Sequence, residues 1–190
     1  MKTLVTFLFV LFTAQAFAQM VQSPVEREGF VIGVGLRGGV VSITDSNQEI
    51  PFEEAQGGFS LPNLKIGFML NERMALLATF PGMIYAHEGK DRSFESFIPK
   101  LQYWMNDKLW INGGIGLGMD FPAFYEVKKI NDEQWNWGCA VSAGVGYEIV
   151  QKQKFTIDLQ SDLMLGRTFL PNDLHRDGVV FTVGVGFNWY

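Results

Sequence analysis

Apolar side chains alternate with glycine or polar side chains through most of this chain, and that alternation limits the possible folds more than any other feature. In the segment 109–121 the odd positions are mostly large and apolar, whereas the even positions include Trp110, Asn112 and Gly114. Successive side chains of a β-strand point to opposite faces, so such a segment has one apolar face and one small or polar face. Helical periodicity is weak, and the sequence predicts an all-β protein.

The alternation predicts eight strands of roughly ten residues each, which is the length that a tilted strand needs to cross a bilayer. Pro81 indicates a bulge or kink within the third strand, because proline cannot donate a hydrogen bond to a strand ladder. The predicted strands are 30–37, 64–70, 74–86, 97–104, 109–121, 136–149, 155–165 and 181–189.

The connections between these strands alternate between short and long. The short ones are 71–73, 106–108 and 151–153, and the long, polar ones are 42–59, 87–94, 122–135 and 167–177. This alternation is typical of an antiparallel up-and-down barrel, with tight turns on one rim and loops on the other.

The distribution of charge indicates which face of the barrel is inside. A soluble barrel would turn the apolar face inward and the polar face to water, but the polar face is dominated by Gly, Ala, Ser and Asn and is poor in charge. The inverse arrangement puts apolar residues against lipid and pairs the charges in a narrow interior. We therefore predict a transmembrane barrel with an interior polar network of Arg37, Lys65, Lys100, Glu148, Asp158 and Asp162.

The first residues have the features of a secretory signal peptide. A short positive start with Lys2 precedes the apolar run 4–12, and small residues follow at Ala16 and Ala18. We predict a signal peptide over 1–18, a short periplasmic segment over 19–29 and a barrel domain over 30–190. The alternative is an uncleaved anchor helix, but the apolar run is shorter than a spanning helix needs.

Composition excludes several other classes of protein. A formal net charge of −5 argues against a general nucleic-acid-binding surface, and a single cysteine, Cys139, excludes a disulfide framework or a multi-cysteine metal site. After the signal peptide, no apolar stretch is long enough for a transmembrane helix.

The signal peptide, the amphipathic strands, the alternating connections and the aromatic C-terminus resemble the small outer-membrane β-barrel family of the OmpA-barrel and OmpX kind. The resemblance implies the outer membrane of a Gram-negative bacterium, periplasmic turns, four extracellular loops, and contact with outer-membrane lipids and lipopolysaccharide. It also implies that the barrel-assembly machinery recognises the aromatic end of the chain, here Phe187, Trp189 and Tyr190. Family members usually end on a lipid-facing aromatic; here that parity falls on Phe187 and Trp189, one residue before the end.

Catalytic chemistry finds little support in the sequence. Some eight-stranded barrels are lipid A deacylases that use a histidine, a serine and an acidic residue. This chain has only His87, with Glu88, Ser93 and Ser96 nearby, and His175, and neither has a recognisable nucleophile–base spacing.

No cofactor or metal site is predicted either. The glycine runs 33–35 and 114–118 resemble phosphate-binding loops, but no helix follows them, so close packing and barrel curvature explain them better. An eight-stranded barrel has room only for its own side chains, which argues against a wide pore. We expect a non-enzymatic barrel with a structural, adhesive or ligand-sensing role through its loops, and the alternative is a lipid A deacylase-like enzyme.

Overall fold

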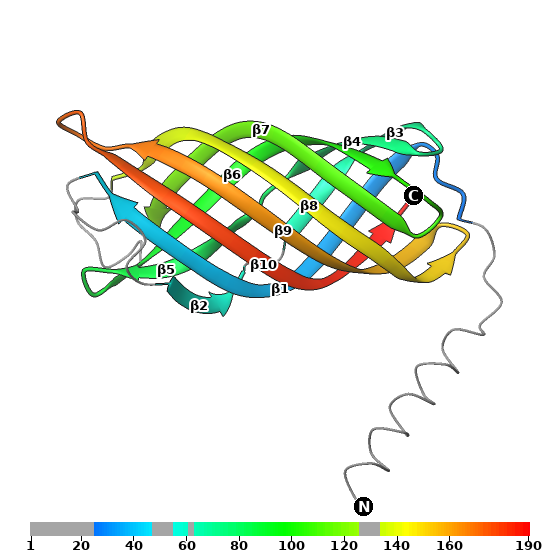
Figure 1. Ribbon diagram of the computed structural model, residues 1–190, viewed down its shortest axis with the longest axis horizontal. Coiled ribbons are helices and arrows are strands. Elements are labelled where there is room, and N and C mark those ends of the chain that lie inside the picture. Colours follow the sequence, from blue (N-terminus) through cyan, green and yellow to red (C-terminus); the bar gives the residue numbers. More distant parts are fainter. Residues whose placement is uncertain (1–24, 47–54, 61–62, 126–133) are drawn as a thin grey trace, which may run out of the picture.

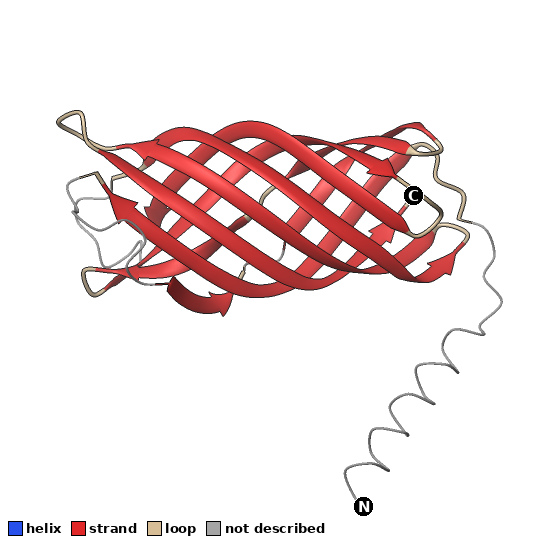
Figure 2. Ribbon diagram, in the orientation of Figure 1, coloured by secondary structure: helices blue, strands red, loops and turns tan. Residues whose placement is uncertain are grey.

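The computed structural model describes residues 25–46, 55–60, 63–125 and 134–190, and these are almost entirely β-strand (Figure 2). No helix among these residues is long and apolar enough to cross a bilayer. The strands are β1 (Phe30–Asp45), β2 (Ala55–Phe59), β3 (Asn63–Asn71), β4 (Met74–Thr79), β5 (Gly82–His87), β6 (Lys90–Trp104), β7 (Leu109–Pro122), β8 (Asn136–Lys152), β9 (Phe155–Phe169) and β10 (His175–Trp189).

A closed ring of antiparallel strands forms the wall of the molecule, in the order β1-β3-β4-β6-β7-β8-β9-β10. The ring closes where β10 pairs with β1, from Ile32 opposite Trp189 to Asp45 opposite Arg176. Figure 1 shows tilted strands around one long barrel, with the C-terminus at the same end as the β3–β4 and β8–β9 turns. The predicted eight-stranded up-and-down barrel is therefore confirmed.

Two shorter strands extend the wall on the other rim. β2 runs beside β1 above β3, and β5 runs beside β6 above β4. Residues 80–81 separate β4 from β5 without a change of register, since Thr79 faces Ile98 and Gly82 faces Glu95. Pro81 lacks an N–H, and it interrupts this strand as the sequence predicted.

β2 and β5 face each other across a gap in the ladder. Within the described segments no strand pairing joins them. Instead, the Gln56 amide donates to the Ala86 carbonyl at 2.9 Å and accepts from the Ala86 N–H at 2.7 Å. Ser60 adds a bond from its hydroxyl to the Gly82 carbonyl at 2.9 Å. Side chains here replace the backbone ladder that closes the rest of the wall.

Three of the four predicted long connections are shorter than expected because the strands continue into them, whereas the connection between β7 and β8 keeps its predicted length. The predicted loop 87–94 is wrong, since β6 begins at Lys90 and only Glu88 and Gly89 form the turn, with φ of 51° and 74°. The predicted loop 42–59 contains the end of β1 and all of β2, and the loop 167–177 shrinks to 170–174. Beyond the apolar belt an outward side chain need not be apolar. The alternation of apolar and polar residues therefore stops before the strand does, and the sequence does not show the strand's true end.

The outer face of the barrel carries an exposed apolar belt, as the lipid-facing assignment requires. Its members lie on the outward positions of all eight ring strands. They include Phe30, Ile32, Leu36, Leu64, Ile66, Phe68, Leu76, Phe97, Leu101, Ile111, Ile115, Leu117, Val141, Val145, Leu159, Leu163, Leu165, Phe181 and Val183.

The interior is filled with side chains and is layered along the barrel axis. Near the turns, one buried apolar cluster contains Trp104 and Trp110. Near the opposite rim, a second one contains Phe94 and Met83. Polar residues occupy the space between them, so that β6 presents in order Trp104, Gln102, Lys100, Ile98, Ser96 and Phe94 to the interior. Inward glycines make room for the large residues: a Cβ on Gly146 would lie 2.2 Å from the Trp110 ring.

Candidate functional site

All six residues of the predicted polar network are buried, and the most exposed of them, Arg37, is only 7% exposed. The structure does not gather them into one cluster. Arg37, Lys100 and Asp162 form one group, Lys65 and Asp158 form a second, and Glu148 pairs with a residue that the sequence did not indicate.

The first group centres on the Asp162 carboxylate. Lys100 Nζ donates to Asp162 and, at 2.7 Å, to the Ser142 hydroxyl, which itself donates to Asp162. Arg37 lies 3.9 Å from the same carboxylate and donates to Gln160 Oε1 at 2.7 Å. The second group lies closer to the turns.

In the second group, Lys65 Nζ lies 3.8 Å from Asp158 Oδ2 and 4.9 Å from the centre of the Trp110 ring. Asp158 also accepts hydrogen bonds from Trp110 Nε1 at 3.1 Å and from Asn188 at 3.0 Å. Each charge in the two groups therefore lies beside an opposite charge, as buried ions require, and Lys65 also faces the Trp110 ring.

Glu148 closes the end of the barrel at which the short turns lie. It accepts a hydrogen bond from Arg27 Nη2 at 2.7 Å, from Trp104 Nε1 at 2.8 Å and from Gln151 at 2.9 Å. Arg27 precedes the first strand, so strand periodicity gave no signal for it. Two backbone bonds hold its segment against the rim: Glu26 N–H to the Gln153 carbonyl and the Met69 N–H to the Gly29 carbonyl, both 2.8 Å.

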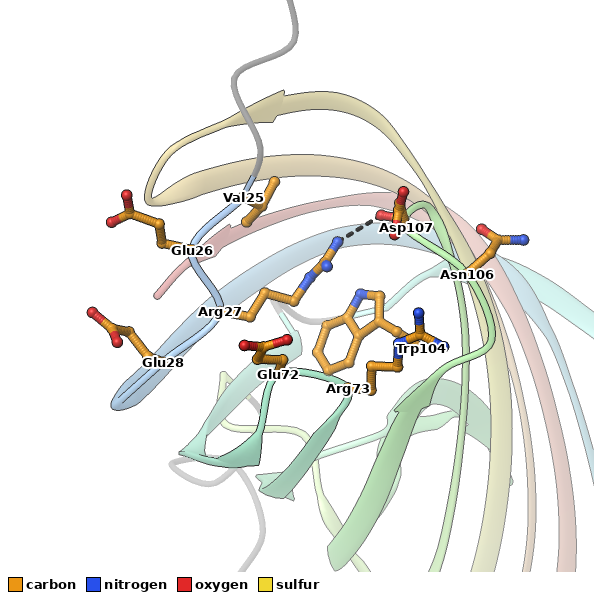
Figure 3. A pocket seen from close by; sticks show the side chains of 9 residues that line it. All are labelled: Val25, Glu26, Arg27, Glu28, Glu72, Arg73, Trp104, Asn106 and Asp107. Atoms are coloured by element: carbon orange, nitrogen blue, oxygen red, sulfur yellow. Dashed lines mark hydrogen bonds between the residues drawn. The ribbon is translucent and has the colours of Figure 1, made fainter.

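A hollow of about 390 Å³ lies outside this closure. In Figure 3, Arg27 extends past the Trp104 indole toward Asp107, whose carbonyl accepts a hydrogen bond from Arg27 at 2.7 Å. The guanidinium carbon lies 4.9 Å from the Trp104 ring centre. The lining residues are Val25, Glu26, Arg27, Glu28, Glu72, Arg73, Trp104, Asn106 and Asp107.

The opposite mouth is closed by three charges from predicted loops, Asp45, Arg92 and Arg176, and by Asp120 from the predicted strand 109–121. Arg176 donates to both carboxylate oxygens of Asp45 at 2.6 and 2.7 Å, to Asp120 at 2.8 Å and to the Tyr85 hydroxyl at 2.9 Å. Arg92 donates to the two carboxylate oxygens of Asp120 at 3.0 Å each. These pairs join β1, β5, β6, β7 and β10 across the mouth.

His87 takes part in this closure as a neutral imidazole. Its Nε2 lies 2.8 Å from Arg176 Nη2, and because arginine can only donate, Nε2 accepts. Burial, and after it the charge of Arg176, holds the pKa of His87 below its ordinary value, although Asp45 and Glu88 oppose this. Burial raises the pKa of Asp45, but its bonds and attraction to Arg176 outweigh burial and bring it below the ordinary value.

The candidate serines have other partners than the histidines. The Ser93 hydroxyl donates to Glu95 at 2.8 Å, and the Ser96 hydroxyl to the Pro81 carbonyl at 3.1 Å. His175, at the start of β10, has Nε2 3.8 Å from Asp177. The Ser46 hydroxyl accepts a hydrogen bond from the backbone N–H of His175 at 3.0 Å, but among the described residues no hydrogen bond joins a serine hydroxyl to a histidine ring.

The three C-terminal aromatic residues lie on two faces. Trp189 is outward and 45% exposed, and its ring centre lies 5.3 Å from that of Phe155. Phe187 shares the outward parity with Trp189. Tyr190 turns inward, where its hydroxyl donates to Glu148 at 3.3 Å and its ring meets Trp104 edge-on, with centres 6.1 Å apart.

Comparison with solved structures identifies the same architecture elsewhere. The attachment invasion locus protein Ail of Yersinia pestis superposes with a TM-score of 0.51 at 16% identity, covering 85% of this chain and 99% of that one. Neisserial surface protein A gives a TM-score of 0.55 at 14% identity, with 83% and 96% covered. No family model and no curated protein sequence matches the chain. The fold is thus that of the small eight-stranded outer-membrane β-barrels.

Proposed function

We propose that this protein is a closed, non-enzymatic barrel of the bacterial outer membrane that acts through its surface rather than through its interior. The observation that carries the proposal is the layered interior. Arg27 and Glu148 close one mouth, the Arg176 cluster closes the other, and two apolar clusters and the buried ion pairs fill the space between them. A polar solute has no path through such a core.

The apolar belt and the position of the turns support a location and an orientation. The short turns and the segment 25–29 lie at one end of the barrel (Figure 1). We assign that end to the periplasm and the mouth closed by Arg176 to the outside. Lipids and lipopolysaccharide surround the belt, and the barrel-assembly machinery recognises the end of the chain at Phe187, Trp189 and Tyr190. Outer-membrane fractionation combined with heat-modifiability on a detergent gel tests this; recovery in the soluble periplasm would refute it.

The loops are the surface through which the protein acts, in a structural, adhesive or ligand-sensing role. Ail has also been solved in complex with the heparin analogue sucrose octasulfate, which is a polyanion. In this chain the connections 46–54 and 123–135 carry more acidic than basic residues. Arg92 and Arg176 are already paired with carboxylates. We therefore infer that the extracellular partner is not a polyanion of that kind.

Conductance of the folded barrel in planar bilayers tests the closed interior. We expect no steady conductance above that of the lipid. The informative control is a variant in which both mouths are opened, Arg27→Ala with Arg176→Ala, measured at equal protein density. A steady conductance in the wild-type barrel would reject a closed interior.

The non-enzymatic assignment has its own test. Folded barrel is incubated with lipid A and phospholipid, and acyl loss or transfer is followed by mass spectrometry. We expect no turnover, because His87 is held by Arg176 and Ser93 by Glu95. Turnover that disappears in His87→Ala or His175→Ala would establish the deacylase-like alternative.

A further inference from the structure

The hollow at the mouth with the short turns has a lining rich in carboxylates. It has a volume of about 390 Å³ and lies between the segment 25–28, the β3–β4 turn and the β6–β7 turn. The lining contains two arginines, and one of them, Arg27, is already paired with Glu148. Against these stand four carboxylates, those of Glu26, Glu28, Glu72 and Asp107. This balance of charge favours a positively charged occupant.

The four carboxylates have no cation of their own. Among the residues that the structure describes, none of them takes part in an ion pair or accepts a hydrogen bond at its side chain. In Figure 3 the carboxylates of Glu26 and Glu28 extend away from the Trp104 indole, whereas Glu72 lies beside it in this view. The Trp104 N–H donates to the Arg73 carbonyl at 2.9 Å, which holds the turn that carries Glu72 next to Trp104.

The Arg27 guanidinium lacks acceptors at the same hollow. Both of its hydrogen bonds, to the Asp107 carbonyl and to Glu148, use Nη2. Within the described part of the chain, Nε and Nη1 have no hydrogen-bond partner. The side chain is only 9% exposed, so little water is available to replace that partner. Because buried N–H groups are normally paired, an acceptor is expected in the hollow beside Nη1.

We propose that this hollow binds a lysine-bearing peptide segment of a periplasmic protein. The compartment rests on the orientation proposed above, whereas the binding chemistry rests on the hollow itself. The lysine ammonium group donates to the Glu72 carboxylate, and a neighbouring peptide carbonyl accepts from Arg27 Nη1. The lysine methylene groups lie against Val25 and the Trp104 indole, which are the apolar part of the lining. Arg73 repels the ammonium group and limits the affinity.

Titration of the folded barrel in detergent micelles tests the proposal. The probe is a blocked glycine peptide with one central lysine, and the readout is the indole N–H resonance of Trp104. We expect a saturable shift of this resonance, and weaker binding when glutamine or glutamate replaces the lysine. Glu72→Gln should raise the dissociation constant by about fivefold, and Arg73→Gln should lower it by up to about the same factor, because an exposed ionic contact contributes up to about 1 kcal/mol.

The matched controls make the same changes of charge outside the hollow. Asp173→Asn lies in the β9–β10 loop at the other end, where a φ of 59° is compatible with asparagine, and Lys154→Gln lies in the exposed β8–β9 turn on the same rim. Both should bind the probe as the wild type does.

Three results would overturn the proposal: no saturable shift, equal affinity for the lysine and glutamine peptides, or affinity unchanged in both Glu72→Gln and Arg73→Gln. A heat-modifiability shift on each sample verifies that the barrel is folded. Because binding is measured in detergent, a barrel recovered outside the outer membrane counts against the proposed function and not against the peptide site.

Discussion

Phe94 on β6 crosses the interior and lies against Gly178 on β10. A Cβ on Gly178 would stand 2.4 Å from the Phe94 ring, well inside van der Waals contact, and Phe94 itself is fully buried. Gly166 on β9 lies under the same ring, with a Cβ distance of 3.0 Å. The ring therefore spans the barrel near its outer mouth, and the glycines opposite are the space that it needs.

Substituting Gly178→Ala should destabilise the barrel, because the added methyl group overpacks a rigid buried ring. Overpacking of this kind costs about 1–3 kcal/mol. The measurement is the urea midpoint of unfolding in detergent or liposomes. Gly113→Ala is the control, since its Cβ would meet only the Ser142 carbonyl at 3.6 Å. In a Phe94→Leu background the Gly178→Ala penalty should largely vanish; a penalty that stays the same would show that the ring is not its cause.

Arg27→Ala should destabilise the barrel by about 3–5 kcal/mol, because it leaves the buried Glu148 carboxylate without its cation. Arg27 belongs to the segment before β1. If that segment did not contribute to the barrel, the substitution would leave the free energy of unfolding unchanged. Arg73→Ala is the control: it lines the same hollow but is exposed. Equal unfolding midpoints for the two variants would mean that Arg27 does not close this mouth.

Asp158→Ala should lower the unfolding midpoint by a similar amount, since it removes the carboxylate beside Lys65 and the acceptor for Trp110. Asp107→Ala, in an exposed turn, serves as the control. The indole of Trp110 provides a second readout, because its fluorescence should shift when Nε1 loses its partner. A midpoint that does not move would place Asp158 in contact with bulk water.

The outer mouth should loosen as the pH falls from about pH 7.5 to about pH 5. The folded protein keeps the pKa of His87 below the unfolded value, so protonation favours the unfolded or open form once the pH drops below the ordinary histidine value. Imidazolium would then face Arg176 and Arg92, with only Asp45 and Glu88 to offset them. Asp45, whose pKa is lowered, stays ionised throughout this range.

Limited proteolysis at the outer rim measures this loosening, and His87→Gln should remove most of its pH dependence. His175→Gln is the matched control, as His175 lies outside the Arg176 cluster. Identical pH profiles for the wild type and His87→Gln would exclude His87 as the responding group.

The architecture could be predicted from the sequence because every strand of a membrane barrel alternates apolar residues with small or polar ones. Ile111, Ile115 and Leu117 face lipid while their neighbours face a narrow interior, and this contrast repeats along the chain. The inward position of Lys100 or Asp162 follows from parity alone. Pro81 correctly predicted the interruption between β4 and β5, because the missing N–H of proline is a local property that the sequence shows directly.

The partners of those residues could not be predicted, because they depend on the stagger between strands. Parity puts Arg37, Lys65, Asp158 and Asp162 inside, but only the register decides that Lys65 meets Asp158. The Arg176 cluster was missed for a different reason. Asp45, Arg92 and Arg176 lie where the strands leave the belt and polar residues are expected anyway, so their segments were predicted as loops.

The gap between β2 and β5 implies an order of events when the wall comes apart. The first and last strands of the ring, β1 and β10, are joined along most of their length, from Ile32 to Asp45. Between β2 and β5 the wall depends on the amide of Gln56 and the hydroxyl of Ser60. Amide protons of β5 on that side should exchange with solvent before those of β10. The wall should therefore open first between β2 and β5, in the middle of the sequence, while the first and last strands, β1 and β10, stay paired.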